Sequence, residues 1–194
     1  MIETRVSLIQ RVREKQTDAW TEFLDIYRPL LVAYVHKRGV SEHDAADVVQ
    51  DVFTRLMTAL TEFELDAERG RFRTWLWRVT HSALTDWARR RAVRDRAERG
   101  WVDQRQPADD ADADGEWNEL YRRRILEAAI ERVRASAQPI TWACFEGRIL
   151  AARPATEIAA ETGVSINAVY VNASRLLARV REECATFEEP LTSL

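Results

Sequence analysis

Apolar side chains recur every three or four residues along much of this 194-residue chain. The first such run consists of Trp20, Phe23, Leu24, Tyr27, Leu31, Tyr34 and Val35. Because an α-helix has roughly 3.6 residues per turn, this spacing places these side chains on one helix face. The chain contains only six glycines and five prolines, too few for the many turns of a β-rich fold. The sequence therefore predicts an all-α protein.

Two further helices follow with the same periodicity. One is predicted over residues 42–63, after a turn in which Ser41 is a good N-cap. The next is predicted over residues 72–94 and closes in a run of arginines. Pro29 lies inside the first apolar run and lacks a backbone N–H, so it is predicted to kink or split that helix.

Charge is distributed unevenly, although the formal net charge is only −3. Residues 69–99 hold ten arginines against three acidic residues, whereas residues 100–119 hold seven acidic residues against one arginine. A basic segment beside an acidic one is typical of nucleic-acid-binding proteins, although a solvated helix and a spacer would share this pattern. Low hydrophobicity predicts a flexible acidic linker. We expect two small helical domains: residues 1–99, the linker 100–116, the second domain 117–184 and a tail 185–194.

Several classes of site are disfavoured. Cys144 and Cys184 form no CxxC pair, and the histidines lack metal-ligand spacing, so neither a metal nor a cofactor is expected. The acidic stretch resembles the start of a calcium-binding EF-hand loop, but Tyr121 stands where the loop needs glutamate. No catalytic arrangement is visible, which argues against an enzyme. Without a signal peptide or a membrane-spanning run, a cytoplasmic protein without membrane contact is expected.

Residues 154–181 carry the most informative pattern of the second half. A short helix is predicted up to Thr162, followed by Gly163, the N-cap residue Ser165 and a longer helix. Glycine suits the tight turn because it adopts a positive φ without strain. Two helices joined in this way form a helix-turn-helix, whose second helix enters the DNA major groove. The expected core between them is formed by Ile158, Ala159, Val164, Val169 and Leu176.

The outward face of this second helix is the candidate DNA-contacting surface. Its arginines suit phosphates, and its polar side chains suit base edges. An ordinary helical hairpin with a solvated arginine face is the alternative. The candidate residues, including the N-cap, are Ser165, Asn167, Tyr170, Val171, Ser174, Arg175 and Arg179.

Three segments together resemble the extracytoplasmic-function sigma factors, the smallest group of the bacterial primary-sigma-like family. Residues 44–53 are similar to the family's polymerase-binding helix, and residues 72–91 to its promoter-melting and minus-ten helix. Residues 157–181 are similar to its minus-thirty-five helix-turn-helix. The resemblance covers nearly the whole chain. It implies a transcription initiation factor that binds core RNA polymerase, directs it to specific promoters and assists promoter melting.

The resemblance also implies where the partners bind. In the family, the loop before the third helix captures a flipped-out base, and stacking on aromatic and arginine side chains offsets the unstacking. An acidic patch on the second helix would suit a basic polymerase surface. Core polymerase is expected at Asp47, Val48, Gln50, Asp51 and Phe53. The minus-ten element is expected at Phe63, Arg69, Arg71, Arg73, Trp77, Arg78 and His81, with Trp77 exposed. The minus-thirty-five element is expected at the seven residues named above.

Two departures from the family pattern stand out. Housekeeping sigma factors carry a tryptophan pair where this chain has Arg78 and Val79, which predicts stricter promoter dependence. Residues 170–172 replace a frequent basic run, so base specificity is not assigned. An anti-sigma factor is a further partner that the resemblance implies, and the free chain is expected to be a monomer. The alternative function is a stand-alone helix-turn-helix regulator, which would need to dimerise.

Overall fold

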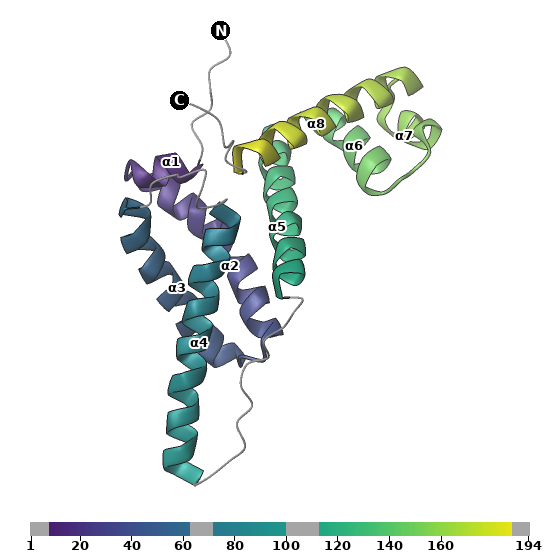
Figure 1. The fold of residues 1–194 in the computed structure, drawn as a ribbon. Helices are drawn as coiled ribbons and strands as arrows, with labels where there is room; N and C mark the ends of the chain where they lie inside the picture. The colour runs from purple at the N-terminus through teal and green to yellow at the C-terminus, as the bar shows by residue number, and fades with distance from the viewer. Residues whose placement is uncertain (1–7, 63–71, 100–112, 188–194) are drawn as a thin grey trace. The chain divides into compact units, whose positions relative to one another are not determined.

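The computed structural model describes residues 8–62, 72–99 and 113–187, and all its regular elements in these ranges are helical (Figure 1). The all-α prediction is confirmed for this part of the chain. No described helix has an apolar stretch of the length that a bilayer crossing needs. The elements are α1 (Leu8–Arg13), α2 (Thr17–Lys37), α3 (Glu42–Glu62), α4 (Phe72–Arg99), α5 (Ala113–Ser136), α6 (Pro139–Phe145), the π-helical turn η1 (Glu146–Leu150), α7 (Ala155–Thr162) and α8 (Ile166–Phe187).

Contacts divide the described chain into two compact units between Arg124 and Ile125, inside α5. The N-terminal unit holds α1 to α4 and the first half of α5. The C-terminal unit holds the second half of α5 and the helices that follow. The sequence placed the start of the second domain at residue 117, eight residues before this division. Most of the predicted acidic linker lies outside the described residues, and its residues 113–116 are helical.

Aromatic side chains of α2 form the core of the N-terminal unit. Phe23 is fully buried, with its ring centroid 4.6 Å from that of Tyr27 and 6.1 Å from that of Phe72 at the start of α4. The α3 helix packs against both α2 and α4 (Figure 1). At its start, the Asp44 N–H donates to the Ser41 Oγ at 3.2 Å, which confirms the predicted N-cap.

The first half of α5 packs on this same aromatic core. Trp117 is fully buried and lies edge-on to Tyr34, with ring centroids 5.0 Å apart. Its indole N–H donates to the Arg73 carbonyl at 3.2 Å. One turn later, Tyr121 is buried with its ring 6.2 Å from that of Tyr27. Burial of two large aromatic rings explains why residues up to Arg124 belong to the N-terminal unit.

Pro29 was predicted to kink or split its helix; α2 runs unbroken through it, so the helix is not split. Proline has no N–H to donate to the Asp25 carbonyl, four residues earlier. The guanidinium of Arg124 donates there instead, at 3.3 Å from Asp25 O and 3.0 Å from Ile26 O. A side chain from α5 thus supplies a donor to the carbonyl that proline leaves without its helical partner.

The C-terminal unit is built around a small core between α6, α7 and α8. Gly163 has a φ of 73° after α7, and the Ala168 N–H donates to the Ser165 Oγ at 3.1 Å, as the sequence predicts. Ile149 and Leu150 lie exposed in η1. The buried cluster consists of Cys144, Ala155, Ile158 and Val169, with Ala159 and Val164 packed against it.

Replacing Trp117 with alanine should destabilise the N-terminal unit by roughly 3–5 kcal/mol, because a buried indole and its packing are lost. Hydrogen exchange on peptides from α2 and α4 measures this loss separately from the C-terminal unit. Leu126→Ala on the same helix is the control, since Leu126 is 48% exposed. Unchanged exchange in α2 and α4 of Trp117→Ala would contradict the packing described here.

Candidate functional site

The α3 helix presents a polar face, which the sequence assigned to a protein partner. Asp47 and Gln50 are exposed on it. Asp51 is half-buried because it is engaged by two arginines, with Arg55 Nη2 at 2.9 Å and Arg90 Nη2 at 3.6 Å from its Oδ2. Two of the three polar candidates therefore remain available to a partner, and the third is held within the unit.

Val48 and Phe53, the two apolar candidates on α3, do not lie on this face. Val48 is 2% exposed and Phe53 is 6% exposed, and the ring of Phe53 lies edge-on to Phe23 in the core. Both side chains therefore belong to the core of the unit in this structure, beneath the polar face. The helical period explains this, because side chains three or four residues apart share one face of a helix. Neighbouring residues can therefore face opposite sides, as exposed Asp47 and buried Val48 do.

Arg55 links α3 to α4 through an ion-pair network. Its Nη2 lies 2.9 Å from Asp51 and 2.9 Å from Asp86, and its Nη1 lies 3.2 Å from the Ser82 Oγ. The hydrogen bonds that Arg55 donates to Asp51 and, with a smaller effect, to Asp86 raise the pKa of Arg55 despite partial desolvation. Charge-assisted pairs of this kind hold the two helices in register.

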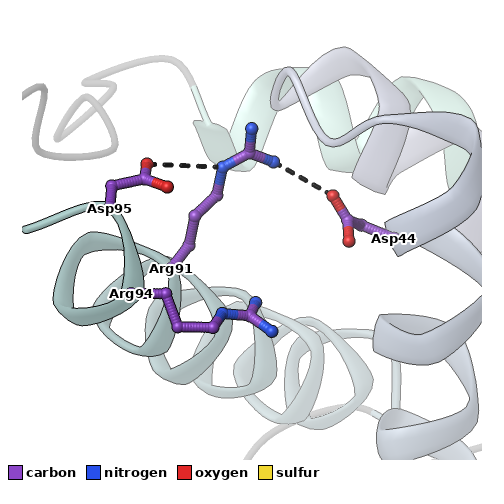
Figure 2. Close-up of a pocket in the computed structure, with 4 residues that line it drawn as sticks. All are labelled: Asp44, Arg91, Arg94 and Asp95. Carbon is purple, nitrogen blue, oxygen red and sulfur yellow. Dashed lines mark hydrogen bonds and ion pairs between the residues drawn. The ribbon is translucent and has the colours of Figure 1, made fainter. Parts of the chain in front are cut away.

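A second charged cluster lines an open cleft between the start of α3 and the end of α4 (Figure 2). Arg91 is central: its Nη1 lies 3.0 Å from Asp44 of α3, and its Nε lies 3.8 Å from Asp95 of α4. Its guanidinium also lies 5.3 Å from the Trp87 ring centroid. Figure 2 shows Arg94 beside this group on the same helix. The basic end of α4 is therefore partly neutralised by acidic side chains, some of them from α3.

The minus-ten candidates are only partly placed. Phe63, Arg69 and Arg71 lie outside the described residues. Arg78 and His81 are exposed on α4, and Arg73 is half-buried near its start. Because these three residues lie on α4, the structure brings together this part of the predicted minus-ten set.

Trp77 was expected to be exposed, and the structure corrects this. Its side chain is half-buried, and its indole N–H donates to the Tyr34 Oη at 3.1 Å. Its ring stacks on His81, with centroids 5.2 Å apart and planes 24° from parallel. A hydrogen bond to a residue 43 positions away leaves no trace in the helical period, so the sequence pattern could not reveal it.

The candidates on α8 lie together at its exposed N-terminal and central turns. All seven are exposed, including Tyr170 at 50% and Val171 at 37%. The guanidinium of Arg148 from η1 lies 5.7 Å from the Tyr170 ring centroid and adds a cation that the sequence analysis missed. Arg179 donates to the Ser136 Oγ at 2.6 Å, so its side chain is held toward the end of α5.

Among the described residues, no cluster of His, Cys, Asp or Glu side chains could hold a metal ion. The candidate surfaces on α3, α4 and α8 consist mainly of exposed polar, aromatic and charged groups on helices. Such surfaces bind macromolecules through many separate contacts.

The Arg55–Asp86 pair should show an interaction free energy of about 0.5–1 kcal/mol in a double-mutant cycle, because both groups are partly exposed. The cycle compares Arg55→Gln, Asp86→Asn and the double variant by urea unfolding. Additive effects of the two substitutions would mean that the pair does not connect α3 to α4.

Arg153, just before α7, holds Glu161 near the end of that helix, and one of their contacts measures 3.0 Å. The hydrogen bond from Arg153 lowers the pKa of Glu161. The contribution of this pair to stability is present above the ordinary carboxylate pKa and is lost as the pH falls through the lowered pKa. An NMR titration should show Glu161 returning to its ordinary range in Arg153→Ala. An identical titration in both proteins would contradict the pairing.

Comparison with known proteins identifies the N-terminal unit. Residues 23–94 match the family model described as Sigma-70 region 2, which covers α3 and most of α2 and α4. The ECF RNA polymerase sigma factor SigW of Bacillus subtilis (strain 168) is 25% identical to this chain over 83 residues. That alignment covers 43% of this chain and 43% of the relative, so it spans less than half of either protein. These findings confirm the resemblance inferred from the sequence: residues 23–94 are similar to Sigma-70 region 2, and the matched part of the chain is similar to a sigma factor of the extracytoplasmic-function group.

Proposed function

We propose that this chain is a transcription initiation factor that binds core RNA polymerase, directs it to particular promoters and assists their opening. The observation that carries the proposal is the Sigma-70 region 2 match over residues 23–94, on helices that keep a polar face exposed. A factor of this kind regulates transcription rather than catalysing a reaction. It works where polymerase and DNA meet, so the cytoplasm is its proposed location.

Core polymerase is proposed to dock on α3 through Asp47 and Gln50. Both side chains are exposed on adjacent turns, where a carboxylate and an amide can accept and donate hydrogen bonds. Negative charge on this face would steer the approach of a basic partner surface. Asp51 contributes less directly, because Arg55 and Arg90 already engage it. Val48 and Phe53 support this face from the core beneath it.

The minus-ten element is proposed to bind along α4. Arg78 and His81 are exposed there, and the stacked Trp77 and His81 rings provide an aromatic surface on the same stretch. A base that leaves the duplex costs a few kcal/mol in lost stacking, and stacking on aromatic or arginine side chains returns about 1–3 kcal/mol per base. Phe63, Arg69 and Arg71 remain proposed contacts of the same kind.

The minus-thirty-five element is proposed to bind α7 and α8 as a helix-turn-helix. Its turn has the left-handed glycine and the serine N-cap that this motif needs. Asn167 and Tyr170 lie near the N-terminus of α8, the part of a recognition helix that reaches base edges. Ser174 and Arg175, farther along, suit the phosphate backbone.

Two DNA-binding units on one chain bind weakly by themselves and tightly when polymerase holds them at promoter spacing. The free chain has a formal net charge of −3, which weakens its attraction to DNA. An anti-sigma factor is proposed as an antagonist, and the free chain is proposed to be a monomer.

The double variant Asp47→Ala, Gln50→Ala should weaken binding to core RNA polymerase about tenfold or more, because it removes the exposed polar groups of α3. Fluorescence anisotropy of the labelled full chain measures this affinity. The control is Thr54→Ala, Thr58→Ala, which alters exposed residues farther along the same helix.

Absence of wild-type binding to a competent core polymerase from a related host would contradict the proposed function. A specific shift of promoter DNA without polymerase would then favour a stand-alone regulator. If both double variants bound core polymerase as tightly as the wild type, the proposed function would stand and the proposed docking face on α3 would be rejected.

A further inference from the structure

The first half of α5 covers a surface of α2 and α4 beside the proposed minus-ten residues. Trp117 has its indole N–H on the carbonyl of Arg73, a minus-ten candidate. The same ring lies edge-on to Tyr34, whose hydroxyl accepts the indole N–H of Trp77. Trp117 of α5 therefore contacts Arg73 directly and reaches Trp77 through the side chain of Tyr34. Both Arg73 and Trp77 are proposed minus-ten residues of α4.

Polar contacts hold both ends of residues 116–124 of α5 against α2. At its start, Glu116 lies 3.0 Å from Lys37 Nζ and 3.1 Å from Arg38 Nη2, at the end of α2. At its end, Arg124 donates to the carbonyls of Asp25 and Ile26. Each set of contacts joins α5 to α2 or to its C-cap residue, and both lie beside the buried aromatic contact.

Tyr34 receives support from both sides of this contact. Trp117 packs against the edge of its ring, and the Arg38 guanidinium lies 4.9 Å from its ring centroid. Glu116 fixes that same guanidinium. Removing α5 therefore removes one neighbour of Tyr34 and releases the charge that holds the other. Trp77, which is hydrogen-bonded to Tyr34, would lose its fixed position in turn.

Charge acts in the same direction as packing. The docked Glu116 neutralises two cations of α2, and Asp114 adds an exposed negative charge one half-turn earlier. A polyanion approaching α4 meets less positive charge while α5 is docked than after its release.

We infer that residues 116–124 form an intramolecular latch that competes with single-stranded DNA for the α2–α4 surface. When the latch is docked, Trp77 is held against Tyr34, and the cations of α2 are occupied by Glu116. When it is released, Trp77 can stack on a base, and Lys37 can approach a phosphate. The inference rests on the proposed role of α4 in minus-ten binding, and it adds an internal competitor to that role.

Two variants that open the latch by opposite changes in charge test this inference. Glu116→Arg adds positive charge and repels Lys37 and Arg38, whereas Arg124→Ala removes a positive charge. Both should bind a short fluorescein-labelled single-stranded DNA of mixed sequence about five- to tenfold more tightly than the wild type, as expected for about one newly available stacking contact. Anisotropy of the full chain at low salt measures this affinity.

Matched controls separate release of the latch from altered charge. Glu119→Arg makes the same charge change as Glu116→Arg at an exposed position of α5, and Arg122→Ala matches Arg124→Ala in the same way. Both controls should stay within about twofold of the change expected from charge alone. Hydrogen exchange at residues 116–124 should rise in the two open variants only.

The outcomes keep the latch apart from the proposed function. Loss of protection at residues 116–124 without tighter DNA binding would overturn the latch. The latch would also be overturned if Glu116→Arg and Glu119→Arg gained equal affinity for the DNA and Arg124→Ala gained none. Binding to core polymerase, measured on the same proteins, reports on the proposed function. If binding to core polymerase is retained while either of these results is seen, the latch is rejected and the proposed function is kept.

Discussion

The aromatic face of α2 is the feature on which the N-terminal unit depends. Phe23 and Tyr27 receive Phe72 at the start of α4, and Tyr27 and Tyr34 receive the rings of α5. Aromatic rings bury large areas and pack edge-on with a defined geometry, so one helix face fixes the positions of two others. The helix that presents this face contains Pro29, and Arg124 of α5 donates to the carbonyl that the proline leaves without its helical partner. The core and the covering segment are thus parts of one packing arrangement.

Charge organises the surface of the same unit. Acidic residues of α3 pair with arginines of α4, so Arg55, Arg90 and Arg91 are engaged within the fold. An arginine that holds two helices together has less positive charge to offer to DNA. Exposed groups outside these pairs, such as Asp47 on α3 and Arg78 on α4, are better suited to partners. The unit therefore separates structural charges from those available for binding.

The C-terminal unit combines a small core with one exposed helix surface. A small apolar core of α6, α7 and α8 leaves the first turns of α8 exposed. The proposed DNA-contacting residues stand there, joined by Arg148 from η1. Since the proposed affinity comes from two linked units, neither surface needs to bind DNA strongly alone.

The sequence by itself determined the helical class, the N-caps at Ser41 and Ser165, the left-handed turn at Gly163 and the exposed face of α8. These features are local, because they depend on the helical period and on the φ and hydrogen-bonding preferences of single residues. Only the tertiary structure decided that Trp117 belongs to the N-terminal unit, that Trp77 is held by Tyr34 and that Asp51 is engaged by arginines. Those outcomes depend on contacts between residues far apart in the chain. Periodicity identifies the face of a helix that is buried, but it does not identify the side chains that cover it.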